Sequence, residues 1–175
     1  MDVIKAYILG EIISSNSSEA FSLYEKSNFG EISKSKDKVQ YSLPETLFLV
    51  EKNKLIVLNS KNREILFKEL MDKFKRIDKK IQIKYPVFKD LREKGYIVKT
   101  ALKFGADYRI YEKGYKVGEQ HAKWVCFVDH ESNKLTWHEF SAKNRVAHST
   151  KKKLLLAILD EEGDISYYEV GWVRT

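Results

Sequence analysis

A run of cations beside an apolar segment is the part of the sequence best suited to bind an anion. Lysines occupy positions 151–153, between Ser149 and the apolar run LLLAIL. Serine is a common N-cap, so the pattern predicts a helix that begins at Ser149 with the lysines in its first turn. The helix dipole disfavours cations there, but a phosphate bound at that end would offset this cost. With Arg145 and His148 just upstream, we expect an anion site rather than a lysine-rich chain that tolerates a poor helix start.

Residues that could hold a metal ion are sparse. Cys126 is the single cysteine and lies in the apolar run WVCFV, so we expect a core residue, no intrachain disulfide and no cysteine zinc site. His130 and His138 lack metal-ligand spacing, and we expect no metal and no cofactor. A metal-dependent DNA nuclease or junction resolvase would need clustered carboxylates with a lysine. Asp107 near Lys103 is the nearest approach to that arrangement.

The overall charge is basic, with a formal net charge of +7 and a pI of about 9.2. This balance is compatible with a polyanionic partner but does not establish one. Hydrophobic residues make up 43% and charged residues 33% of the chain, which is typical of a globular protein. We see no apolar run long enough to cross a bilayer and no cleavable signal pattern in the opening MDVIKAYILGEII, and therefore expect a cytoplasmic protein.

The pattern of elements predicts an α+β chain of two small mixed α/β domains, 1–82 and 83–175. In the first half we expect short strands around a polar turn at SSNSS, a helix capped by Ser42 with Pro44 in its first turn, a strand at LIVLN and a helix over 63–80. In the second half we expect a helix from Pro86 to Gly95, followed by strands at 96–105, 106–114 and 121–130. We then expect a strand or helix start at NKLTWHEF, a helix over 148–159, an acidic turn and a final strand at ISYYEVGWV.

The second half resembles the catalytic domain of the archaeal tRNA-splicing endonucleases. The resemblance rests on LREKGYIVKTALKFGADYRIYEKG, on EQHAKW and on NRVAHSTKKKLLLAILDEEGDISYYEVGWV, which follow in order from about Tyr85 to Thr175. The string RVAHS before a basic segment is the most specific feature. The first half, notably YSLPETLFLVEKNKLIVL, is similar to that family's N-terminal domain. The resemblance implies a C-terminal nuclease domain with a central mixed sheet flanked by helices.

The resemblance also implies three catalytic residues, which are Tyr111, His121 and Lys152. Such an enzyme removes introns from precursor tRNA by attack of the ribose 2′-oxygen on the adjacent phosphate, which leaves a 2′,3′-cyclic phosphate and a 5′-hydroxyl. Imidazole suits the general acid, and an ammonium group suits the charge of the transition state. Tyr111 is the base only by resemblance and could instead orient the 2′-hydroxyl. Taken singly, a tyrosine in a strand usually packs and a histidine after a loop usually lies on the surface.

Binding and assembly are expected from the same resemblance. Arg145 is a candidate to stack on a base of the bulge–helix–bulge RNA, with Lys151 and Lys153 as further substrate contacts. The family forms tetramers, from one kind of chain or with a related structural subunit. The acidic turn would dock on another subunit through Asp160, Glu161, Glu162 and Asp164, and the final strand suits edge pairing. The alternative within this family is a binding-only subunit in which the three catalytic candidates merely pack or contact phosphate.

Overall fold

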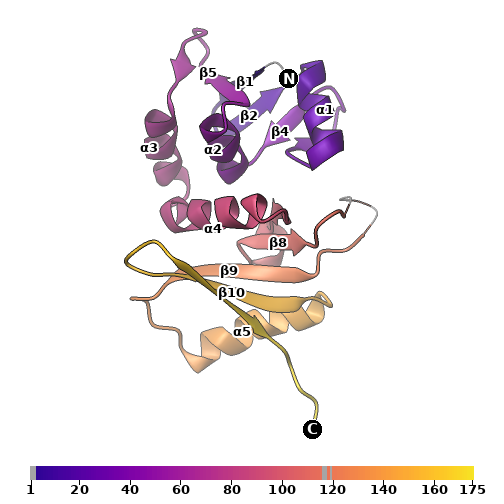
Figure 1. Cartoon of the computed structure of the whole chain (residues 1–175), viewed down its shortest axis with the longest axis vertical. Coiled ribbons are helices and arrows are strands. Elements are labelled where there is room, and N and C mark those ends of the chain that lie inside the picture. The colour runs from indigo at the N-terminus through magenta and orange to yellow at the C-terminus, as the bar shows by residue number, and fades with distance from the viewer. Residues whose placement is uncertain (1–2, 116–117, 119) are drawn as a thin grey trace. The chain divides into compact units, whose positions relative to one another are not determined.

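The computed structural model describes residues 3–115, 118 and 120–175. The chain divides into two compact units, Met1–Tyr85 and Pro86–Thr175. Each unit contains a β-sheet with helices packed on it (Figure 1). The predicted α+β class is therefore confirmed, with one parallel strand pair in each otherwise antiparallel sheet.

The first unit is built on a six-stranded sheet in the order β3-β4-β2-β1-β5-β6. Its strands are β1 (Ile4–Leu9), β2 (Ile12–Ser15), β3 (Glu31–Ile32), β4 (Val39–Tyr41), β5 (Leu55–Leu58) and β6 (Glu64–Ile65), and its helices are α1 (Ser18–Ser27), α2 (Leu43–Glu51) and α3 (Phe67–Ile77). In β1 the residues alternate between buried and exposed, with Ile4, Ala6 and Ile8 buried. This period of two places one face of the sheet against the helices.

Helix α2 begins where the sequence predicts. Ser42 is its N-cap, Pro44 lies in its first turn, and the N–H of Ser42 donates to the Glu45 carboxylate at 3.0 Å. The Glu45 carboxylate also accepts the N–H of Gly30 at 3.0 Å, which connects the helix start to the chain before β3. Leu47 and Leu49 are fully buried, so α2 is held by packing as well as by its cap.

Two helix starts differ from the prediction. The segment 63–80 contains strand β6 before helix α3, because Ile65 pairs with Val57 of β5. The next helix, α4 (Ile81–Glu93), begins before Pro86, which lies inside it. The Asp78 side chain accepts the N–H of Lys80 at 2.9 Å and so satisfies a free donor at this helix start. Proline removes one helical hydrogen bond, which explains why sequence patterns place it at a helix start.

The second unit is built on a five-stranded sheet in the order β11-β10-β9-β8-β7. Its strands are β7 (Ile97–Thr100), β8 (Tyr108–Tyr111), β9 (Trp124–His130), β10 (Lys153–Leu159) and β11 (Ile165–Val170), with a short 3-10 helix, η1 (Leu102–Phe104), and helix α5 (Trp137–Ser149). Strands β9 and β10 are parallel and the other neighbours are antiparallel. The helix-start alternative at NKLTWHEF is confirmed, because Thr136 caps α5 by accepting the Glu139 N–H at 3.2 Å.

Helices cover the sheet of the second unit on both faces (Figure 1). On one face Ala147 of α5 packs with Val125 and Leu154. On the other face Phe88 of α4 contacts Tyr108, with ring centroids 5.9 Å apart. A strand covered on both faces is apolar along its whole length rather than alternating.

This burial explains why the predicted helix over 148–159 is wrong. LLLAIL belongs to the buried strand β10, and a short apolar run of this kind has no periodicity that separates strand from helix. Helix α5 instead ends at Ser149. The N–H of Lys152 donates to the Ala147 carbonyl at 2.9 Å and that of Lys151 to the His148 carbonyl at 3.0 Å. Lys151 has φ +54°, so this is a Schellman motif that closes a helix C-terminus.

Candidate active site

The structure places Tyr111, His121 and Lys152 at the same end of three neighbouring strands. Tyr111 is the last residue of β8, His121 lies three positions before the first residue of β9, and Lys152 directly precedes β10. In the sheet, β9 lies between β8 and β10. Segments that are distant in the sequence therefore end side by side.

Backbone hydrogen bonds hold these strand ends in register. The N–H of Lys123 donates to the carbonyl of Ile110, and the N–H of Lys153 donates to the carbonyl of Lys123, both at 2.9 Å. Neighbouring strands in a sheet are ~4.8 Å apart, so β8 and β10 are separated by about 10 Å. Long side chains that extend from these ends are compatible with contact to a single phosphate group.

Tyr111 and His121 differ in burial. Tyr111 is 5% exposed and packs with Ile97 and Ala122, beside the partly buried Tyr115. His121 is exposed. Because Ala122 directly follows His121, the packing of Tyr111 fixes the chain next to the imidazole. The tyrosine is thus anchored, while the histidine side chain is accessible to a substrate.

Lys152 lies at the negative end of helix α5, so the helix N-terminus predicted at Ser149 is wrong. Its half-buried side chain donates from Nζ to the Thr150 carbonyl at 2.9 Å and lies 5.4 Å from the centre of the Phe104 ring. Carbonyl groups at a helix C-terminus attract a cation and repel an anion. Any phosphate bound here would therefore be held by side-chain charge and not by helix N–H groups.

The exposed face of α5 near its end carries Arg145 and His148. These residues are three positions apart and so lie on the same side of the helix. The His148 ring contacts Trp172 of the C-terminal segment, with ring centroids 4.8 Å apart. Trp172 is 57% exposed. A cation, an imidazole and an indole therefore share one accessible surface beside the segment that leads to Lys152.

Charged side chains also connect the strand ends. Glu112 forms an ion pair with Lys123, and Lys153 forms an ion pair with Glu169 at 2.5 Å. The indole N–H of Trp124 donates to Glu169 at 2.7 Å. The hydrogen bond from Lys123 lowers the pKa of Glu112, and the same bond raises the pKa of Lys123. Sequence patterns did not reveal this network, because its members come from segments that are far apart in the sequence.

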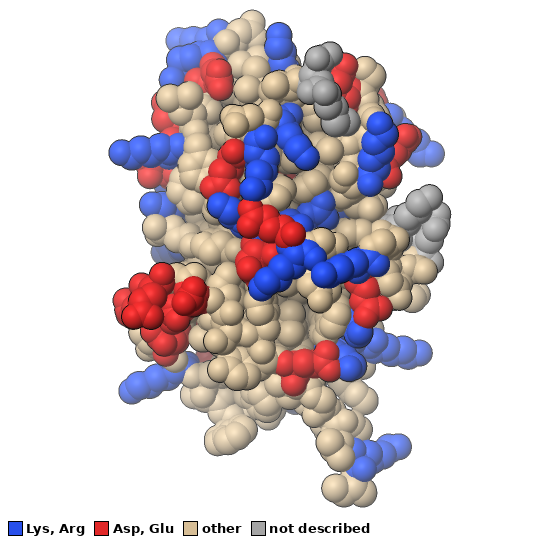
Figure 2. Space-filling model, viewed as in Figure 1, with Lys and Arg blue, Asp and Glu red and all other residues tan. Residues whose placement is uncertain are grey.

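The predicted acidic turn lies between β10 and β11. Asp160 organises it, because its side chain accepts the N–H groups of Glu162 at 3.0 Å and Asp164 at 2.8 Å. The N–H of Glu161 donates to the carboxylate of Glu131 at 3.0 Å. The turn forms a compact acidic patch at the left edge of Figure 2. Glu161, Glu162 and Asp164 are exposed.

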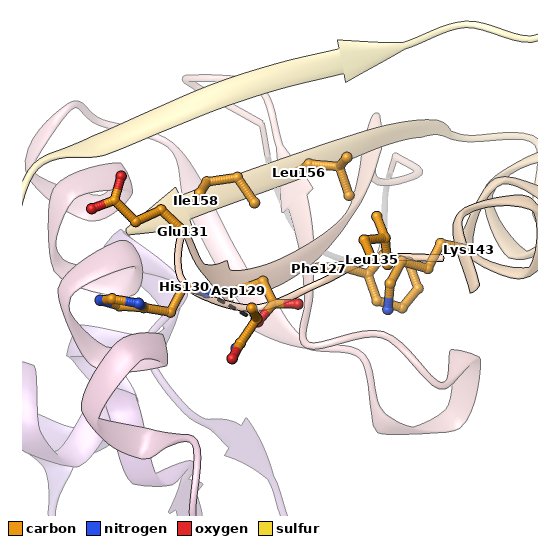
Figure 3. A pocket seen from close by; sticks show the side chains of 9 residues that line it. Phe127, Asp129, His130, Glu131, Leu135, Lys143, Leu156 and Ile158 are labelled. Carbon is orange, nitrogen blue, oxygen red and sulfur yellow. Dashed lines mark hydrogen bonds between the residues drawn. The ribbon is translucent and has the colours of Figure 1, made fainter. Parts of the chain in front are cut away.

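A cavity of about 110 Å³ opens at the other end of β9 and β10 (Figure 3). It is lined by Phe127, Asp129, His130, Glu131, Asn133, Leu135, Lys143, Leu156 and Ile158. The Lys143 ammonium lies 4.4 Å from the centre of the Phe127 ring. None of the predicted catalytic residues lines the cavity, so it is separate from the strand ends that carry Tyr111 and Lys152.

Two further findings concern the described residues as a group. Within 3–115, 118 and 120–175, no set of three or more His, Cys, Asp and Glu residues is arranged to hold a metal ion. No helix in the same part of the chain is long and apolar enough to span a membrane. Cys126 is fully buried, which confirms it as a core residue, and burial raises the pKa of its thiol.

Comparison with known proteins gives matches over both units. Residues 81–167 match the model of the tRNA intron endonuclease catalytic C-terminal domain, and residues 4–71 match that of the N-terminal domain. A tRNA-splicing endonuclease of Pyrococcus horikoshii is 40% identical over 98% of this chain and 97% of its own length. That of Pyrococcus abyssi is 39% identical over 98% of both chains, and that of Methanothermobacter thermautotrophicus is 39% identical over 87% of this chain and 86% of its own.

These relatives are archaeal, and the similarity runs through both units rather than through a single motif. The matched C-terminal segment contains all three strand ends described above and helix α5. By its two domains and by its near full-length relatives, this chain belongs to the tRNA intron endonuclease family.

Proposed function

We propose that this endonuclease removes introns from precursor tRNA by cutting at bulge–helix–bulge splice sites. The reaction needs no metal ion and leaves 2′,3′-cyclic phosphate and 5′-hydroxyl ends. The family and the names of its archaeal relatives support the tRNA substrate. The functional domains are 1–82 and 83–175, and the protein acts in the cytoplasm.

The observation that carries the proposal is the shared position of Tyr111, His121 and Lys152 at the ends of β8, β9 and β10. Internal attack by the ribose 2′-oxygen requires removal of its proton, protonation of the leaving 5′-oxygen and stabilisation of the charged transition state. Three groups around one phosphate supply these functions without a bound metal. The strand register supports that arrangement, because it brings the three chain segments together.

Each group has the environment that its role requires. His121 is exposed and so accessible to the leaving oxygen, to which its imidazolium donates a proton. Lys152 supplies a positive charge to the non-bridging oxygens, and its carbonyl contact with Thr150 orients the ammonium group. Tyr111 is anchored by packing and positions or deprotonates the 2′-hydroxyl. A phenol is a weak base at neutral pH, so orientation is the role that we favour.

Substrate binding uses the exposed surface at the end of α5. Arg145 stacks on an extruded bulge base, because a guanidinium plane pairs well with a base. The exposed Trp172, which contacts His148, gives a second stacking surface nearby. Lys151 is exposed and contacts a backbone phosphate. Lys153 is already paired with Glu169, so its contribution to RNA binding is smaller than expected from its charge.

The working enzyme is a tetramer that places two active sites on one substrate. Strand β11 is the outermost strand of its sheet and has an exposed Tyr168, so it offers an edge for pairing with a second copy. The acidic turn from Asp160 to Asp164 docks on a basic surface of another subunit. The partner is a second copy of this chain or a related structural subunit.

Incubation of the pure protein with an intron-containing precursor tRNA in EDTA tests the proposal. Cleavage at both splice sites with cyclic phosphate ends is the expected result. A substrate with 2′-deoxyribose at each scissile position should resist cleavage, because it has no attacking oxygen. Dependence on magnesium would instead identify a metal-dependent nuclease. Binding without cleavage, even when extract supplies partner chains, would identify a binding-only subunit.

A further inference from the structure

We propose that two linked ion pairs, which we call the charge ladder, position the catalytic groups at the ends of the strands. The charge ladder consists of Glu112, Lys123, Lys153 and Glu169. Its members do not touch the reacting atoms, and they act by holding four strand ends in alignment. This inference rests on the proposed function, because it assigns a task to residues around the same site.

The charge ladder joins four different strands. Glu112 follows β8, Lys123 precedes β9, Lys153 begins β10 and Glu169 lies in β11. Glu112 pairs with Lys123, and Lys153 pairs with Glu169 at 2.5 Å. Trp124 connects the two pairs, since its indole N–H donates to Glu169 at 2.7 Å and the Lys123 ammonium lies 4.6 Å from its ring centre. The connection is therefore continuous from β8 to β11.

Strand alternation places Lys153 of the charge ladder on the face opposite Lys152. Leu154 packs on the α5 face, so Lys153, the residue before it, points to the α4 face. The Trp124 ring on that face contacts Tyr96, which follows α4, with centroids 6.0 Å apart. Lys152 points the other way and lies over Phe104, which packs against the same core cluster as Leu154. Lys153 and the Trp124 ring thus lie on the face opposite the catalytic lysine.

Three of the four ladder members are close in sequence to a catalytic group. Glu112 directly follows Tyr111, and Lys153 directly follows Lys152. Lys123 lies two positions after the catalytic histidine. A shift of one ladder side chain therefore moves the backbone that carries a catalytic group. Misplacement by about 1 Å can reduce an enzymatic rate by about a hundredfold.

The exposure of the ladder separates positioning from general stability. The side chains of Glu112 and Lys123 are each 38% exposed, and those of Lys153 and Glu169 are 54% and 42% exposed. Ion pairs that are this exposed contribute little to folding. Hydrogen bonds from Lys123 and from Tyr115 lower the pKa of Glu112, in agreement with a formed pair at neutral pH. Loss of a pair should therefore alter catalysis while the chain stays folded.

The experiment compares Glu112→Gln, Lys123→Met and the charge swap Glu112→Lys/Lys123→Glu with the parent protein. Single-turnover cleavage of an intron-containing precursor tRNA gives the rate, and filter binding of the uncut 2′-deoxy substrate gives Kd. We expect each single variant to cut about tenfold more slowly, within the range that small misplacements cause. We expect Kd to change by less than about twofold, because Glu112 and Lys123 are not among the proposed RNA contacts. The charge swap should recover most of the rate.

Asp72→Asn and Lys75→Met are the matched controls, because they break an exposed pair of the first unit, with N–O 3.8 Å, and remove the same charges. Both should cut at the parent rate. Thermal melting shows whether each variant is folded. If a variant of the first pair does not fold, Glu169→Gln tests the second pair independently. The proposal would be overturned if folded ladder variants cut at the parent rate, or if they lost affinity and rate equally. It would also be overturned if the charge-swap variant folded but did not recover the rate. A parent protein that does not cut the RNA would instead overturn the proposed function.

Discussion

Replacing Lys152 with alanine removes one half-buried ammonium group and, with it, two contacts. The Nζ group donates to the Thr150 carbonyl at 2.9 Å and lies 5.4 Å from the Phe104 ring centre. The hydrogen bond contributes about 1 kcal/mol to folding, and the cation–π contact adds about 0.5 kcal/mol. We therefore expect the free energy of unfolding to fall by about 1 to 2 kcal/mol.

The loss of catalysis should be much larger than this loss of stability. Removing one preorganised group that stabilises transition-state charge costs about 3 to 4 kcal/mol, or a rate loss of about a hundredfold to a thousandfold. A protein whose free energy of unfolding is about 5 to 15 kcal/mol stays folded after a loss of about 1 to 2 kcal/mol. The single-turnover rate, measured well below the melting temperature, therefore reports the role of the ammonium group and not unfolding.

Lys151→Gly is the matched control, because it removes the same charge one residue earlier. Lys151 has φ +54°, a conformation that costs an L-residue roughly 1 kcal/mol and glycine almost nothing. We expect this variant to melt at a slightly higher temperature and to cut within about threefold of the parent rate, since a surface charge contributes weakly. A Lys152→Ala protein that cuts within about tenfold of the parent, or a Lys151→Gly protein that loses as much, would refute the assignment.

Three further outcomes are expected. His121→Ala should slow cleavage by about a hundredfold or more, because general acid catalysis contributes a rate factor of about that size. Kd for the 2′-deoxy RNA should stay nearly constant. Equal losses of rate and affinity would remove the imidazole from the acid role. The bonds from Lys153 and Trp124 lower the pKa of Glu169 below its usual 4.5, so its contribution to stability is present above pH 4.5 and is lost as the pH falls through the lowered pKa. Melting temperatures measured from pH 6 to about 3 should therefore fall less for Glu169→Gln than for the parent, and identical curves would contradict this reasoning. Tyr168→Lys should shift the sedimentation of the protein to a smaller species, because a charge on an exposed strand edge opposes pairing; unchanged sedimentation would place the subunit contact elsewhere.

Much of the fold follows from local sequence patterns. The cap of α2 at Ser42 and Glu45 is a contact between residues three positions apart, so a sequence pattern captures it fully. The buried Cys126 is predicted by its apolar neighbours. The α+β class follows from the mixture of short strands and amphipathic helices.

The errors share a physical cause, which is that tertiary burial overrides local preference. LLLAIL reads as a helix or as a strand until its position between α4 and α5 is known. The pattern at residues 151–153 predicts a helix start, but the Schellman bonds of Lys151 and Lys152 close the preceding helix. Lysine in the left-handed conformation at that position gives no glycine signal in the sequence. Pro86 likewise indicated a helix start although α4 continues through it.

The sequence by itself determined the residue types, the positions of the two matched domains and the order of the candidate catalytic groups along the chain. Only the tertiary structure decided that Tyr111, His121 and Lys152 lie at adjacent strand ends and that two ion pairs link the same four strands. The reason is that strand order and register are set by pairing between distant segments and by burial of the sheet faces. Neither property is encoded in the spacing of residues along any one strand.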